Sequence, residues 1–125
     1  MSIIYPKMSD PVKVAYGSTV GIITCTDNRK VYIDGVYAHA GYGASTSVQV
    51  YFVPNGGTSD AEEYRIYNND IAKNSNDKFE IYASPFCLQN TGDALFVGTG
   101  NFGTTGVGAT CTFIITGWRD DGIVA

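Results

Sequence analysis

A glycine-rich stretch near the C-terminal end of the chain has the spacing of a phosphate-binding loop. Residues 97–108 read VGTGNFGTTGVG, in which Gly98, Gly100 and Gly103 form a literal G-x-G-x-x-G. In dinucleotide-binding proteins a strand leads into the first glycine and a helix begins at the last, so that pyrophosphate meets free helix N–H groups. Here residues 109–118, ATCTFIITGW, are β-branched and aromatic without helical spacing. We therefore interpret the stretch as a hairpin loop and expect no bound nucleotide.

The remaining residue types that do chemistry in proteins form no catalytic or metal-binding pattern. His39 is the only histidine and lies between two alanines in a predicted strand, where a structural role is expected. The carboxylate pairs Glu62–Glu63 and Asp120–Asp121 match neither a calcium loop nor a glycosidase pair. No Walker motif, zinc pattern or nucleophile elbow occurs in the sequence. We expect a protein that is not an enzyme and that uses no cofactor or metal.

The three cysteines, Cys25, Cys87 and Cys111, are an odd number without metal-ligand spacing. Each lies among apolar residues, which favours buried, reduced thiols in a protein made in a cytoplasm. A bridge between Cys25 and Cys111 is the alternative. The first ten residues lack the positively charged and apolar regions of a signal peptide, which also favours synthesis in a cytoplasm.

Length and charge limit the classes of partner. A chain of 125 residues is sufficient for one domain with its own core. The formal net charge is −4, and the eight Lys and Arg residues are spread from Lys7 to Arg119 without a basic patch. We therefore expect no nucleic-acid partner. No apolar run approaches the ~20 residues that span a bilayer, so we also expect no membrane partner.

Short apolar or β-branched runs alternate with clusters of Gly, Asn, Asp and Ser along the whole chain. This alternation predicts an all-β fold: a single antiparallel β-sandwich of jelly-roll or Greek-key type with about eight strands. A closed eight-stranded barrel is the structural alternative. We expect an extended N-terminal arm over residues 1–11, followed by one domain over residues 12–125. The predicted strands cover residues 12–16, 19–26, 31–40, 47–53, 63–68, 78–83, 94–97 and 109–118.

One predicted strand changes phase in its middle. In residues 31–40, Val31 and Ile33 share a face, but the next apolar pair, Val36 and Ala38, lies one position out of step. A β-bulge inserts one extra residue and produces such a shift. We therefore predict a bulge at Asp34-Gly35.

Period-two alternation divides the strand residues between a core face and an outer face. The core face is predicted to hold Val48, Val50, Phe52, Phe79, Ile81, Leu95, Val97, Cys111, Phe113 and Ile115. The outer face is predicted to hold Tyr32, Tyr37, His39, Gln49, Tyr51, Tyr67, Glu80, Tyr82, Thr110 and Thr112.

Five of the nine tyrosines are therefore predicted to point outward. Tyrosine is enriched where a surface meets a partner, but it is also a good strand former on an exposed face. If these residues form an interface, association between copies of the chain is favoured, because most soluble oligomers are homo-oligomers. The predicted interface residues are Tyr32, Tyr37, Tyr51, Tyr67 and Tyr82.

Residues 24–118, about three quarters of the chain, resemble small virion proteins of tailed bacteriophages. The shared features are a polar hairpin, a strand, and then the pattern L-x-x-x-G-D-x-L-x-V, here Leu88, Gly92, Asp93, Leu95 and Val97. The closing TFIITGW is similar to the final strand of those proteins. The resemblance implies a capsid decoration (cement) protein or another head or tail accessory protein, with no catalytic residues. It also implies a homotrimer.

We therefore expect a structural virion protein that associates with its own copies and docks on a phage capsid or tail protein. A carbohydrate-binding module, or the receptor-binding domain of a tail or fibre, is the alternative. That alternative takes a glycan as partner and is favoured by the exposed tyrosines and by Trp118 at the end of the final strand. A small enzyme is the third hypothesis.

Overall fold

The structure is a computed structural model. It describes residues 2–5, 10–15, 17–27, 29–41, 46–59, 61–72, 75–80, 86–99 and 110–120. The described residues form ten strands and one short 3-10 helix, η1. Their bounds are β1 Ser2–Tyr5, β2 Val12–Ala15, β3 Thr19–Thr24, β4 Val31–Ala40, β5 Thr46–Val53, η1 Glu62–Tyr64, β6 Arg65–Ile71, β7 Asn76–Glu80, β8 Phe86–Leu88, β9 Ala94–Thr99 and β10 Thr110–Asp120.

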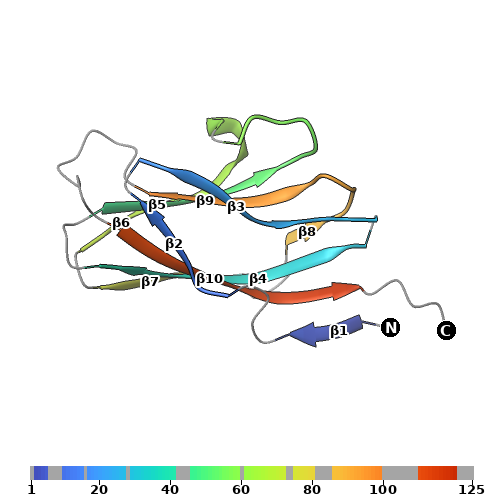
Figure 1. Cartoon of the computed structure of the whole chain (residues 1–125), viewed down its shortest axis with the longest axis horizontal. Helices are drawn as coiled ribbons and strands as arrows, with labels where there is room; N and C mark the ends of the chain where they lie inside the picture. The colour runs from blue at the N-terminus through green and yellow to red at the C-terminus, as the bar shows by residue number, and fades with distance from the viewer. Residues whose placement is uncertain are drawn as a thin grey trace.

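The strands form two antiparallel sheets that face each other (Figure 1). In the six-stranded sheet β10 and β4 are central, with β1 and β2 beside β10 and with β7 and β8 beside β4. The four-stranded sheet has the order β3-β9-β5-β6. The predicted β-sandwich is confirmed, and the barrel alternative is wrong because the two sheets are separate.

The pairing order is that of a jelly roll. Strands β5 and β6 form a central hairpin, and the flanking strands pair around it as β4 with β7, β3 with β9 and β2 with β10. The contacts of β10 with β4 and of β5 with β9 then roll this long hairpin into two sheets. The predicted jelly-roll class is therefore confirmed, with β1 and β8 added to the eight basic strands.

The core lies between the sheets and consists mainly of aliphatic side chains. Seven predicted core residues are at most 2% exposed: Val48, Val50, Leu95, Val97, Cys111, Phe113 and Ile115. Phe52 and Phe79 are only partly buried, although both pack against the core. Ile81 lies outside the described residues. The prediction is confirmed where strand alternation is regular, since alternate side chains there face the opposite sheet.

The G-D turn of the virion-like pattern has a structural role. Gly92 has φ +97°, and a Cβ there would overlap the Asn55 side chain, so this position requires glycine. The buried Asp93 carboxylate accepts hydrogen bonds from the backbone N–H groups of Asn55 and Asn90, each at 3.0 Å. Asp93 therefore joins the loop after β5 to the turn before β9.

All three cysteines are free thiols. Cys25 and Cys111 are buried as predicted, and Cys87 is partly buried. The Cys25 thiol donates to the Arg29 carbonyl at 3.2 Å. Burial raises the pKa of each thiol, to about 12 for Cys111, which keeps the sulfur protonated and unreactive.

The N-terminal segment contributes the strand β1, which pairs antiparallel with the end of β10 in the same chain. Ser2 is opposite Asp120, and Tyr5 is opposite Gly117. The boundary of the arm at residue 11 stays a prediction. Among the described residues, no helix has the length and apolar character to cross a membrane.

Candidate interaction surface

The outer face of the six-stranded sheet presents aromatic side chains on its two central strands. On β4 these are Tyr32 and Tyr37, which are separated by five positions. An odd spacing would put two residues on opposite faces of a regular strand. Both lie on the outer face because β4 has an irregularity between them: Thr116 pairs with Gly35, whereas Gly117 pairs with Ile33.

The irregularity is the bulge predicted from the sequence, and its extra residue is Asp34. The Thr116 hydroxyl donates to Asp34 Oδ1 at 2.7 Å and so fixes the bulge to β10. Gly35 provides space at this point, since a Cβ there would lie 2.7 Å from Thr116 Oγ1 and 3.1 Å from the Tyr37 ring. The bulge thus positions both tyrosines on one face.

At one end of this face Tyr32 stacks on Trp118. The two residues are cross-strand partners on β4 and β10, with ring centroids 5.2 Å apart and an interplanar angle of 16°. Both rings remain partly exposed, and Cys87 on β8 pairs with Tyr32 on the other side. Stacked aromatic pairs of this kind present a large, rigid and partly apolar area to a partner.

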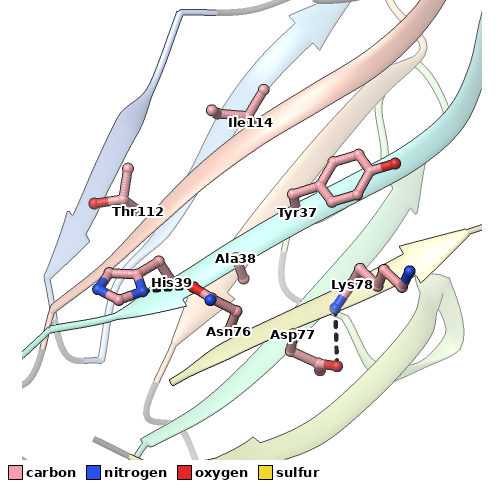
Figure 2. A pocket seen from close by; sticks show the side chains of 8 residues that line it. All are labelled: Tyr37, Ala38, His39, Asn76, Asp77, Lys78, Thr112 and Ile114. Atoms are coloured by element: carbon pink, nitrogen blue, oxygen red, sulfur yellow. Dashed lines mark hydrogen bonds between the residues drawn. The ribbon is translucent and has the colours of Figure 1, made fainter. Parts of the chain in front are cut away.

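At the other end of the face, β10, β4 and β7 surround a shallow concavity of about 640 Å³ (Figure 2). Tyr37 is 38% exposed, the largest exposure of any large hydrophobic side chain in the described residues. His39 Nδ1 donates to Asn76 Oδ1 at 2.6 Å, and Lys78 Nζ lies 2.9 Å from Glu80 Oε1. The residues that line the concavity are Tyr37, Ala38, His39, Asn76, Asp77, Lys78, Thr112 and Ile114.

Sequence reasoning missed part of this concavity. The predicted strand begins at residue 78, which leaves Asn76 outside it, whereas β7 begins at Asn76. Ile114 continues the outer-face alternation of Thr110 and Thr112, and this signal could have identified it. The contribution of Lys78 depends on the pairing of β7 with β4, and no local pattern indicates which strands pair.

Two of the tyrosines that were predicted to point outward, Tyr51 and Tyr67, are not part of this outer face. Tyr51 lies on the outer side of β5 but is only 1% exposed, so the prediction of an outward ring that is open to a partner is wrong. The segment after β5 loops over the outer side of the four-stranded sheet, and η1 contacts β5 (Figure 1), so both sides of this strand are covered. Gln49, on the same side of β5 as Tyr51, was also predicted to be outward and is buried.

The outward prediction for Tyr67 is also wrong. Tyr67 pairs with Val50 and therefore shares its core-facing side, where the Tyr67 ring stacks on Phe79 with centroids 4.9 Å apart. The register shifts only beyond this pair, between Val50 and Tyr51. Tyr82 lies outside the described residues. Tyr32 and Tyr37 do lie on the outer face, and their contact with a partner stays a prediction.

The described parts of the glycine-rich stretch and of the carboxylate pairs form no catalytic or metal-binding group. The run that follows the glycine-rich stretch is strand β10, as predicted, and residues 100–109 lie outside the described part of the chain. Glu62 and Glu63 are exposed on η1. In the described residues, no group of three or more His, Cys, Asp and Glu is placed to hold a metal ion.

Comparison with known proteins finds similarity at the level of structure. The chain matches no family model and no curated protein. It is similar to the crystal structure of PirA, with a TM-score of 0.51 and 8% identity over 87% of this chain and 92% of that chain. The PirA similarity supports the fold alone, because sequence identity is so low.

Two further structures are similar at lower TM-scores. One comes from the Bacillus endospore appendages, a family of disulfide-linked pili, with a TM-score of 0.40 and 16% identity over 94% of this chain and 90% of that chain. The other is from infectious bursal disease virus, Gx strain, with a TM-score of 0.40 and 12% identity over 99% of this chain and 33% of that chain.

Proposed function

We propose that the protein is a non-enzymatic structural protein of a virion, a capsid decoration protein that associates with its own copies and docks on the virion surface. The jelly roll is used by many viral capsid domains and also by lectins, so the fold is compatible with this role without establishing it. The observation that carries the proposal is the partly exposed Tyr32–Trp118 stack on the outer face of the six-stranded sheet.

The surroundings of the stack suit a contact between copies. Trp and Tyr are enriched among the residues that contribute most binding energy, because they remove much apolar area from water. In the described residues, β1 is the edge of the sheet beside the stack, with Ile4 opposite Trp118. An edge strand has backbone groups that a second chain can pair with. A trimer is proposed from the resemblance to phage virion proteins alone.

The location of the contact is tested by introducing charge into the stack. In Tyr32→Asp and Trp118→Asp, a carboxylate replaces a ring that the partner would cover, so the oligomer should dissociate to the 13.4 kDa monomer. Light scattering after gel filtration measures the mass, and circular dichroism checks that the variants remain folded. Tyr37→Asp, on the same face but beyond the bulge, is the matched control and should leave the oligomer intact.

Two results would contradict the proposal. One is a wild-type protein that stays monomeric at all concentrations and binds no virion particle. The other is an oligomer that persists in both folded stack variants, because the Tyr32–Trp118 contact would then be irrelevant to association.

A further inference from the structure

The concavity at the Tyr37 end of the face is separate from the stack. Tyr37 and Tyr32 are five residues apart on β4, which corresponds to roughly 15 Å of strand. The volume of about 640 Å³ lies within the range of pockets that bind small ligands. Such sites combine an apolar surface with a few fixed polar groups, and both are found here.

The apolar surface is the exposed ring of Tyr37. The ring lies against Gly35, where a Cβ would come within 3.1 Å of it, so the glycine allows the ring to approach the backbone of the bulge. Ile114 is the cross-strand partner of Tyr37 and adds an aliphatic side chain beside it (Figure 2). A ring held in this way loses little conformational entropy when a ligand stacks on it.

The fixed polar groups are His39 and Asn76. The hydrogen bond between His39 Nδ1 and Asn76 Oδ1 leaves His39 Nε2 and the two Nδ2 donors of the Asn76 amide for a ligand. Both side chains line the concavity, and Thr112 is the cross-strand neighbour of His39. The site therefore offers donors and acceptors together, which is what a ligand rich in hydroxyl groups requires.

The positive charge beside the concavity is compensated, and the nearby carboxylate is hydrogen-bonded by neutral groups. Lys78 lies beside Glu80. Asp77 accepts hydrogen bonds from the Tyr67 hydroxyl at 2.6 Å and from Asn69 Nδ2 at 3.1 Å. A site built for an anion would present uncompensated positive charge, so the arrangement favours a neutral ligand over an anion.

We propose that this concavity binds a neutral carbohydrate, with the apolar face of one sugar ring stacked on Tyr37 and its hydroxyl groups hydrogen-bonded to His39 and Asn76. This site is distinct from the proposed assembly contact, and either proposal can fail without the other. A subunit that associates through Tyr32 and Trp118 would leave the concavity free to bind a glycan on a cell surface.

The test is a glycan array of neutral oligosaccharides that end in glucose, galactose, mannose or N-acetylglucosamine, with sialylated and sulfated glycans on the same array. We expect binding to at least one neutral glycan, followed by calorimetry with the free form of that glycan. Tyr37→Ala should weaken the affinity by about tenfold or more, and Asn76→Ala should also weaken it. Tyr37→Phe keeps the ring and should retain most of the affinity.

Controls separate this proposal from the assembly contact. Tyr32→Asp and Trp118→Asp should retain glycan binding even where they dissociate the oligomer, and Tyr64→Ala, at η1, should have no effect. The proposal is overturned if no neutral glycan binds, if only the anionic glycans bind, or if Tyr37→Ala binds as well as wild type. It is also overturned if Tyr37→Ala dissociates an oligomer, because a second copy would then occupy the concavity.

Discussion

Asp93 connects three parts of the chain through a single buried carboxylate. Its two oxygens accept the backbone N–H groups of Asn55 and Asn90, and its own backbone carbonyl accepts the N–H of Cys25 at 2.8 Å. The sequence pattern indicated that a glycine and an aspartate precede the strand, but not what the aspartate binds. The partner Asn55 is 38 positions away, and local propensity carries no information about such a contact.

Removal of the Asp93 carboxylate should destabilise the folded protein. Asp93→Ala leaves two backbone donors without their acceptor and should lower the free energy of unfolding by about 2–4 kcal/mol. Asp93→Asn keeps one acceptor oxygen and should cost less. The control Asp70→Ala, at an exposed position of β6, should change it by less than about 0.5 kcal/mol. Urea denaturation measures all three, and equal effects at Asp93 and Asp70 would contradict the structural role.

We expect the contribution of the Tyr67 hydroxyl to the free energy of unfolding to be lost at alkaline pH. Burial, together with the hydrogen bond to the Asp77 carboxylate, raises the pKa of Tyr67 to about 12, against about 10 in an unfolded chain. The folded state therefore favours the neutral phenol. This contribution is fully present below about pH 10 and is lost as the pH rises toward about 12, because the unfolded chain ionises first.

The measurement compares the free energy of unfolding of wild type and Tyr67→Phe at several pH values between about 8 and 11. The variant lacks the hydrogen bond to Asp77 and should be less stable at the lower end of this range. The difference between the two proteins should shrink as the pH rises. A constant difference would show that the Tyr67 hydroxyl does not titrate differently in the two states.

At the scale of the strands, the alternation of apolar and polar residues predicted the face of each side chain where one face of the strand is covered and the other is open to solvent. On β4 the phase shift at Asp34 was visible in the sequence, and it correctly placed Tyr32 and Tyr37 on the same side. On β5 the same reasoning failed for Tyr51, because a later segment covers the outer side of the strand. A strand buried on both sides gives no reliable period-two signal.

Strand β10 provides a direct test of which side chains face the core. Phe113 is fully buried at the centre of β10, so Phe113→Ala should lower the free energy of unfolding by about 3–5 kcal/mol. Lys13, exposed on the neighbouring strand β2, is the control, and Lys13→Ala should change it by less than about 0.5 kcal/mol. Chemical denaturation followed by circular dichroism measures both. A similar small effect at both positions would mean that the register of β10 is wrong.

For the whole molecule, composition and spacing were sufficient to predict an antiparallel β-sandwich of jelly-roll or Greek-key type, but not to choose between these two types. They could not predict the strand order, since the partners β4 and β10 are separated by some 70 residues and only the packed structure brings them together. The same limit applies to the outer face, where His39 and Asn76 become neighbours only through the pairing of β4 with β7.

The central claim, that the Tyr32–Trp118 end of this face joins copies of the chain, is tested most directly by the fluorescence of Trp118. Trp118 is the only tryptophan in the chain, so its emission reports on this position alone. A dilution series, with the mass followed by sedimentation, should show emission that shifts to longer wavelength as the oligomer dissociates and water reaches the ring. An oligomer that dissociates with no change in Trp118 emission, or a protein that is monomeric throughout, would contradict the claim.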